Sequence, residues 1–270
     1  MQLSEIVSRA LEEDVGNGDI TTLATVPAET RGSARIIAKQ DLVVCGHDPA
    51  AEVFRQVGAS YTAVVGEGTH VTPGTVIATV SGPARALLTG ERLALNFMMR
   101  LCGIATRTAD TVKLAGDRMR VVDTRKTTPL MRALERRAVR IGGGHNHRFA
   151  LYDGILIKDN HILAAGSVTA AVEGARAHAH HLMKIELEVE DLSQLEEALD
   201  IGVDVVLLDN MDNETLARAV EINQGRAILE ASGNMTADRL PALARIGIDI
   251  VSIGGLIHQA TWSDLSMRFD

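Results

Sequence analysis

Aromatic side chains are scarce in this sequence, at 3% of 270 residues, and the net charge is −8. Few aromatics leave little surface for base stacking, and an acidic chain is not drawn to a polyanion, so we expect no nucleic-acid partner. The two cysteines, Cys45 and Cys102, are too few for a disulfide framework and lack the spacing of metal ligands. This cysteine usage favours a reducing cytoplasm.

Long apolar runs are also missing, since none reaches the roughly 18 residues that a membrane span requires. The N-terminal stretch MQLSEIVSRALEEDVG has no basic start and no apolar core, which is unlike a signal peptide. We therefore expect no membrane partner. Apolar residues still make up 46% of the chain, enough for one large domain or two of ordinary size.

Positive charge is concentrated in one part of the chain. From Arg118 to Lys158 there are ten cations and three acids, a net of +7 in a chain whose total is −8. A local cationic site in an acidic protein indicates a small, highly anionic ligand. Solvated helix faces are the alternative, and we favour that interpretation for Arg132, Arg136, Arg137 and Arg140.

The hydrophobic pattern changes along the chain. Residues 3–11 have helical spacing, the stretch from about 24 to 90 is mainly β-rich and broken by Gly and Pro, and a helix is predicted from Glu91 to Leu101. After Gly103, apolar strands alternate with amphipathic helices, which predicts right-handed βαβ units and a parallel sheet. The expected strands are 119–124, 154–159, 184–190, 203–210, 226–232 and 249–255. The expected helices between them include 168–178, 192–199, 214–222 and 237–246.

The strand KIELEVE (184–190) bears on whether the sheet closes. Its apolar residues alternate with charged ones, among them Glu186 and Glu188. A strand between two helical layers should be apolar on both faces, so the charged face favours a barrel lumen that is also the active site. A solvent-exposed edge strand is the alternative. In α/β barrels the chemistry sits at the carboxyl ends of the strands.

Polar groups of three kinds follow the predicted strands. Arginine forks bind carboxylates and lysine binds phosphate as a point charge, and the cations near strand ends are Arg125, Lys126, Arg148 and Lys158. The carboxylates Glu188 and Asp209 suit Mg²⁺ shared with substrate phosphates, or the hydroxyls of a ribose. Metal-assisted displacement at a sugar carbon would use both kinds of group.

Glycine-rich strand ends form the third kind. Ser232-Gly233 and Gly254-Gly255 open onto predicted helices and would present backbone N–H groups to a phosphate, although a lone Gly-Gly is more often a simple turn. His145 and His147 do not predict zinc, because no further ligand lies at a suitable spacing. His147 precedes Arg148 and would bind or orient an anion.

Taken together, the motifs resemble those of the quinolinate phosphoribosyltransferases, the decarboxylating nicotinate-nucleotide pyrophosphorylases. The resemblance covers nearly the whole chain, and the motifs are specific as a set rather than singly. They are ALEEDVGNGDITT (10–22), ERLALNFMMRLCGIAT (91–106), DTRKTTP (123–129), GGGHNHR (142–148), ILIKDNH (155–161), LLDN (207–210) and LEASG (229–233).

This resemblance implies an α/β sandwich domain at residues 1–105 and an incomplete α/β barrel, of the type II phosphoribosyltransferase kind, at 106–270. It allows roughly the last 12 residues to pack back on the first domain. It implies that quinolinate and phosphoribosyl diphosphate react, with Mg²⁺, to give nicotinate mononucleotide, diphosphate and carbon dioxide in NAD biosynthesis. It also implies a homodimer with shared active sites.

Residue roles carried over by motif are as follows. The quinolinate carboxylates would be bound by Arg125, His147, Arg148 and Lys158. The reacting centre would comprise Lys126 at the diphosphate, with Glu188 and Asp209 at the ribose and Mg²⁺. Phosphates would be held by Ser232, Gly233, Gly254 and His258, and Arg92 would reach the site of a neighbouring subunit.

The sequence departs from the family in places: Cys102 stands where serine is usual, Asn234 where glycine is usual, and Ile257 and Gln259 where small hydroxyl residues are usual. The last three bear on phosphate binding. One alternative is a sister group linked to molybdate transport, which shares RKT but tends to lack the full IKDNH, present here at 157–161. The other is a non-catalytic anion-binding protein.

Overall fold

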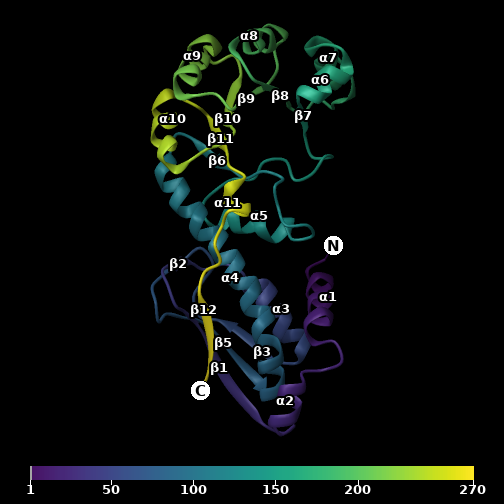
Figure 1. Cartoon of the computed structure of the whole chain (residues 1–270), viewed down its shortest axis with the longest axis vertical. Helices are drawn as coiled ribbons and strands as arrows, with labels where there is room; N and C mark the ends of the chain where they lie inside the picture. The colour runs from purple at the N-terminus through teal and green to yellow at the C-terminus, as the bar shows by residue number, and fades with distance from the viewer. Residues whose placement is uncertain (1) are drawn as a thin grey trace. The chain divides into compact units, whose positions relative to one another are not determined.

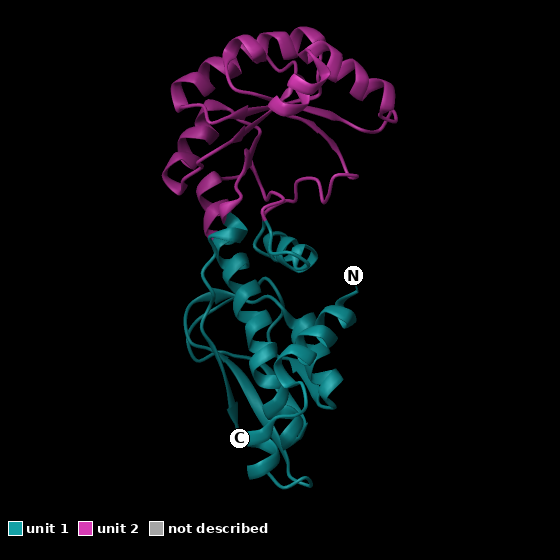
Figure 2. Cartoon of the chain, turned by 45° about the vertical axis from the view of Figure 1, so that its right-hand side comes forward, with its two compact units in different colours: residues 1–109, 127–143, 256–270 teal, residues 110–126, 144–255 magenta. Residues whose placement is uncertain are grey.

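The computed structural model describes residues 2–270 and divides into two compact units (Figure 2). Unit 1 comprises residues 1–109, 127–143 and 256–270, and unit 2 comprises residues 110–126 and 144–255. Each unit is therefore built from segments that lie far apart in the sequence.

Unit 1 contains a four-stranded antiparallel sheet in the order β12-β1-β5-β3 (Figure 1). Alternate residues of β1 are buried, among them Ala34, Ile36 and Ala38, so one face of the strand belongs to the core. The last strand returns to the first, with Leu265 opposite Ala38. The strands of the sheet are β1 (Arg31–Ala38), β3 (Ser60–Ala63), β5 (Val76–Pro83) and β12 (Leu265–Phe269), and a small second pair is β2 (Leu42–Val43) with β4 (His70–Val71).

The helices of unit 1 include one in the region that we expected to be mainly strands and turns. In α3, Ala50, Val53 and Phe54 are buried at helical spacing, so the pattern was present in the sequence. The carboxylate of Glu67 accepts hydrogen bonds from the first backbone N–H groups of this helix, at Gly46 and His47. The helices are α1 (Leu3–Val15), α2 (Ile20–Thr25), α3 (His47–Val57) and α5 (Arg132–Ile141).

Helix α4 (Ala84–Ala115) begins in unit 1 and is far longer than the predicted 91–101. The predicted apolar stripe of Leu93, Phe97 and Leu101 is buried. The polar side of the helix carries Arg92 and Arg100, and Arg100 is not left to solvent. It forms an ion pair with Glu135 of α5 at 2.8 Å and also donates to the carbonyls of Ile257 and Ala260.

The cations of α5 are likewise not simply a solvated face. The side chain of Arg136 is buried, and Arg137 forms ion pairs with Asp48 at 2.6 Å and Glu67 at 2.7 Å. The interpretation that we favoured for these arginines is therefore wrong for Arg136 and Arg137. Their positive charge contributes to the packing of unit 1.

Unit 2 contains a six-stranded parallel sheet in the order β6-β11-β10-β9-β8-β7, with its helices along the outer side of the curve (Figure 2). The six predicted strands are confirmed, as β6 (Arg120–Val122), β7 (Ile155–Ile157), β8 (Ile185–Val189), β9 (Val205–Asp209), β10 (Ile228–Ser232) and β11 (Ile250–Ser252). The helices are α6 (Asp159–Ala165), α7 (Val168–His178), α8 (Leu192–Ile201), α9 (Asn213–Asn223) and η1 (Ala237–Arg239) with α10 (Leu240–Ile246). Helix α11 (Gly255–His258) follows β11, and its residues 256–258 belong to unit 1.

The curved sheet is an incomplete barrel. The first strand, β6, pairs with the last, β11, while β7 pairs with β8, which leaves the opening between β6 and β7. His145 forms a parallel bridge with Val122 of β6, so the segment before β7 runs along this opening. Among residues 2–270, none of the helices combines the length and apolarity needed to cross a bilayer.

A close backbone approach in unit 1 gives a test of the packing. A Cβ atom at Gly103 of α4 would lie 1.9 Å from the carbonyl oxygen of Thr261. We expect Gly103→Ala to lower the free energy of unfolding by about 1–3 kcal/mol or more, because an extra methyl group in a packed contact forces the backbone apart. Urea unfolding followed by circular dichroism measures this.

The matched control is Gly174→Ala in α7, where the added Cβ meets open space. Alanine there should raise stability by up to roughly 1 kcal/mol, because it is the better helix former. Equal urea midpoints for Gly103→Ala and the wild type would contradict the packing described here.

Candidate active site

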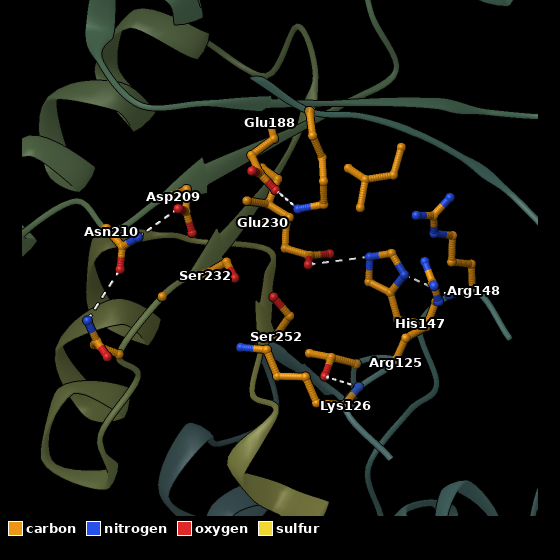
Figure 3. Close-up of a pocket in the computed structure, with 16 residues that line it drawn as sticks. Arg125, Lys126, His147, Arg148, Glu188, Asp209, Asn210, Glu230, Ser232 and Ser252 are labelled. Atoms are coloured by element: carbon orange, nitrogen blue, oxygen red, sulfur yellow. Dashed lines mark hydrogen bonds and ion pairs between the residues drawn. The ribbon is translucent and has the colours of Figure 1, made fainter. Parts of the chain in front are cut away.

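A cavity of about 630 Å³ lies in unit 2 where the parallel strands end (Figure 3). Because side chains at the carboxyl ends of curved parallel strands point toward a common centre, residues distant in sequence meet here. The structure places nine of the predicted site residues in its lining, namely Arg125, Lys126, His147, Arg148, Lys158, Glu188, Asp209, Ser232 and Gly233.

Four predicted residues are not part of this lining: Arg92, Gly254, Gly255 and His258. Arg92 and His258 are exposed, on α4 and α11. Gly254 and Gly255 follow β11, whose last residue Ser252 does line the cavity. Gly254 and Gly255 therefore lie two and three residues after a residue that lines the cavity.

The cationic side of the cavity is organised by a buried carboxylate, Asp123, at the end of β6. Its oxygens accept a hydrogen bond from the backbone N–H of His147 at 2.9 Å and one from the side-chain amide of Asn146 at 2.5 Å. The side chain is completely buried. Asp123 therefore ties the segment containing Arg148 to the strand that precedes Arg125.

The two arginines of this side influence each other. Burial, and next the charge of Arg125, lower the pKa of the Arg148 guanidinium, while Glu186 opposes this shift. One guanidinium N–H of Arg148 donates to the carbonyl of Gly154 at 2.9 Å. Two cations that repel each other, of which Arg148 is partly desolvated, provide a strong site for an anion bound between them.

The acidic side of the cavity comes from neighbouring strands. Glu188 of β8 forms an ion pair with Lys158, and Asp209 of β9 accepts a hydrogen bond from the side chain of Asn210 at 2.7 Å. Carboxylate oxygens on adjacent strands suit a hard divalent cation such as Mg²⁺, and the ion pair of Glu188 shows that this position attracts positive charge. Glu188 and Asp209 are therefore chemically suited to hold Mg²⁺.

The edge formed after β10 requires glycine at one position. Gly233 has φ 83°, and a Cβ there would lie 2.1 Å from Oδ1 of Asn210. Asn234 has φ 44°, a left-handed conformation that asparagine tolerates better than most residues, and its side chain donates to Asn210 at 3.4 Å. The departure from glycine at Asn234 is therefore compatible with the same backbone turn.

A buried cluster that we did not predict lies between the strands, formed by His147, Glu186 and Glu230. Nε2 of His147 is 3.2 Å from a carboxylate oxygen of Glu186. It is 3.6 Å from one of Glu230, whose carboxyl group faces the ring in Figure 3. Glu230 lines the same cavity as Glu188. In the sequence, Glu230 and Ser232 occupy alternate positions of β10, which was the available signal that they share a face.

The titration of this cluster follows from its burial. Burial, and next the charge of Glu186, raise the pKa of Glu230 to about 7, against the opposing effects of His147 and Ser252. Burial lowers the pKa of His147, but its hydrogen bond to Glu186 and the charge of Glu230 produce a net upward shift. The backbone N–H of Arg148 donates to Nδ1 of His147 at 2.7 Å and opposes a second ring proton, since an imidazolium has no acceptor there.

A half-open α/β barrel with cations on one side of its rim and carboxylates on the other is an arrangement for an enzyme that acts on small, phosphorylated polyanions. The chain matches the family models described as quinolinate phosphoribosyl transferase N-terminal domain, at residues 19–102, and C-terminal domain, at residues 104–268. The chain therefore belongs to the quinolinate phosphoribosyl transferase family.

Individual relatives match this chain over about nine tenths or more of their length. A probable nicotinate-nucleotide pyrophosphorylase (carboxylating) of Synechocystis is 44% identical, covering 96% of this chain and 89% of the relative, and one of Bacillus subtilis is 41% identical, covering 99% and 93%. The crystal structure of NadC from Streptococcus pyogenes superposes with a TM-score of 0.94 at 40% identity, covering 99% of this chain and 95% of that one. Its likeness confirms the predicted type II phosphoribosyltransferase fold.

The raised pKa of Glu230 predicts how stability depends on pH. The folded chain keeps this proton up to about pH 7, whereas the unfolded carboxyl, with its ordinary value of 4.5, loses it earlier. The protonated carboxyl group of Glu230 therefore stabilises the folded chain fully below pH 4.5. This stabilisation is lost as the pH rises toward 7, which lowers the free energy of unfolding by up to roughly 3 kcal/mol.

Glu230→Gln cannot ionise and should lack this part of the pH dependence. Urea unfolding at a series of pH values compares it with the wild type. Glu190→Gln, just beyond β8 at an exposed position, removes the same charge and should keep the wild-type slope. Parallel pH curves for Glu230→Gln and the wild type would contradict the assignment.

Proposed function

We propose that this protein transfers the phosphoribosyl group of phosphoribosyl diphosphate to quinolinate with decarboxylation. The products are nicotinate mononucleotide, carbon dioxide and diphosphate, and the reaction belongs to NAD biosynthesis. The observation that carries the proposal is the single cavity of about 630 Å³ that combines a cationic and a carboxylate side, in a chain of this family.

Quinolinate is a dicarboxylate, and the cationic side of the cavity offers matching groups. Arg125, Arg148 and Lys158 bind its carboxylates through charge-assisted hydrogen bonds, with His147 beside them. The mutual repulsion of Arg125 and Arg148 is relieved when an anion lies between them. Lys126 is the cation placed for the diphosphate.

The ribose and phosphates of phosphoribosyl diphosphate bind at the carboxylate side of the cavity. Glu188 and Asp209 face the ribose and would hold Mg²⁺, which neutralises charge on the diphosphate. Lys158, the ion-pair partner of Glu188 in the free protein, is then released toward the anionic substrate. Phosphates are held by Ser232 and Gly233. Further candidates are Gly254 and Gly255, which follow β11, and His258, which ends α11.

The chemistry requires mainly alignment. The ring nitrogen of quinolinate forms a bond with the ribose carbon while the bond from that carbon to diphosphate breaks. The bond between the ring and the adjacent carboxylate then breaks, and the electron pair remains on a carbon next to a cationic nitrogen. That carbon takes up a proton. Holding both substrates in one cavity supplies the proximity that this sequence needs.

The direct test is an assay with quinolinate, phosphoribosyl diphosphate and Mg²⁺ that follows carbon dioxide and nicotinate mononucleotide. Formation of both products is the expected result. Binding of both substrates without product would instead support the anion-binding alternative.

The cationic side yields the first binding prediction. Arg125→Ala and Arg148→Ala should each weaken quinolinate binding by at least roughly tenfold, because each removes charged hydrogen bonds to a carboxylate. Isothermal titration calorimetry with quinolinate measures the dissociation constant. Arg226→Ala, which removes an exposed cation paired with Asp200 in the same unit, is the control and should bind as the wild type does.

We further propose a homodimer with shared active sites. Arg92 is exposed on α4 and is not among the residues that line the cavity of its own chain. A two-fold dimer would allow it to serve the cavity of the other subunit. Each of the two sites would then combine Arg92 of one chain with Arg125 of the other.

Complementation tests this arrangement. Arg92→Ala and Arg125→Ala should each be nearly inactive alone. Refolding an equal mixture should give mixed dimers in about half of cases, each with one intact site, and activity near a quarter of the wild type. If mixed dimers form and activity does not return, Arg92 acts within its own chain or not at all.

A further inference from the structure

Glu186 and Glu230 have no part in the function proposed above, yet they occupy the interior of the barrel. Their exposed fractions are 8% and 3%, and one oxygen of each carboxyl group, Oε1, has no hydrogen-bond partner among the described residues. A buried polar atom without a partner costs free energy. Two such groups side by side therefore require a reason beyond stability.

Both carboxyl groups converge on one nitrogen of His147. Nε2 lies 3.2 Å from Glu186 and 3.6 Å from Glu230, while Nδ1 accepts the backbone N–H of Arg148 at 2.7 Å. Since Nδ1 is an acceptor, the ring proton of this tautomer is on Nε2, from which it is donated to the carboxylate of Glu186. Both ring nitrogens are thus bound within the protein.

The same geometry argues against the cluster as a metal centre. Its three ligand atoms lie within 4.8 Å of one another, close enough to surround an ion. A metal on Nε2 would need the lone pair of that nitrogen, and Nδ1 would then carry the proton and donate it. Nδ1 instead faces the N–H of Arg148, so metal binding would break this hydrogen bond.

The hydrogen bonds around His147 form a continuous connection. Asp123 accepts from the backbone of His147, and His147 accepts through its ring from the backbone of Arg148. At the other edge of the ring, Nε2–H donates to Glu186, and the carboxyl group of Glu230 lies 3.6 Å from the same nitrogen. We therefore expect a change at either glutamate to displace the ring and, with it, the backbone of Arg148.

We propose that Glu186 and Glu230 are positioning residues for quinolinate binding, which they serve by fixing His147 as the Nε2–H tautomer. His147 then contributes a fixed ring surface and a fixed Arg148 backbone, and the substrate's negative charge is met by Arg125, Arg148 and Lys158. This inference rests on the proposed function for its substrate. The tautomer of His147 and the contacts of its ring with Glu186 and Arg148 do not depend on the proposed function.

Kinetics of four variants test the positioning role. Alanine at either glutamate should raise the KM for quinolinate at least about tenfold, with smaller effects on kcat and on the KM for phosphoribosyl diphosphate. Glutamine at residue 186 keeps an oxygen that accepts from Nε2–H, and glutamine at residue 230 keeps a polar side chain of the same shape beside the ring. Glu186→Gln and Glu230→Gln should therefore stay near the wild type. Glu190→Ala, at an exposed position, is the matched control.

Nitrogen-15 NMR of the histidine rings at pH 7 tests the tautomer without any substrate, with signals assigned by comparison with His147→Gln. The expected result is a proton on Nε2 and none on Nδ1 in the wild type. A proton on Nδ1, or on both nitrogens, overturns the proposal. So does stoichiometric Zn²⁺ binding that is lost in Glu186→Gln.

Wild-type KM values for quinolinate in both alanine variants, or glutamine variants as impaired as the alanine ones, also overturn it. If the alanine variants do not fold, the KM values of the glutamine variants and the wild-type NMR spectrum still test the proposal. Failure of the wild type to convert quinolinate would reject the proposed function, whereas the NMR result would stand by itself.

Discussion

The cationic side of the cavity depends on the buried carboxylate of Asp123. It lies directly after β6, in the opening of the barrel, and it binds the backbone of His147 and the side chain of Asn146. A fully desolvated carboxylate needs such donors, so the segment that carries Arg148 cannot move without exposing an unsatisfied charge. The position of Arg148 relative to Arg125 follows from this contact.

Opposite charges in the cavity are kept apart by the sheet itself. Cations come from the segment after β6, from the segment before β7 and from the residue after β7, whereas Glu188 and Asp209 lie at the carboxyl ends of β8 and β9. Lys158 is where the two sides meet, through its ion pair with Glu188. A ligand with a dicarboxylate at one end and a phosphorylated sugar at the other matches this order of strands better than a ligand with one kind of charge.

Much of the site could be predicted, because polar residues at the ends of apolar strands are conspicuous in the sequence. Arg125, Lys158 and Asp209 stand out in this way, and all three line the cavity. Asp123 also ends a predicted strand, but nothing in the sequence indicated that it binds the segment containing His147. Glu230 did not stand out, since a single acid within an apolar strand gives no sign of its partners. Helix α3 was missed for a similar reason: its short apolar pattern is surrounded by Gly-rich strands.

The sequence by itself determined the βαβ alternation of unit 2, the charged face of β8 and the family, because periodicity and motif order are local properties of the chain. Only the tertiary structure decided which carboxyl groups are buried together, which groups contact the two ring nitrogens of His147, and that Arg100 and Arg137 pair with acids from other segments. Those properties depend on distances between residues far apart in the chain, and such distances exist only once the strands have curved and packed.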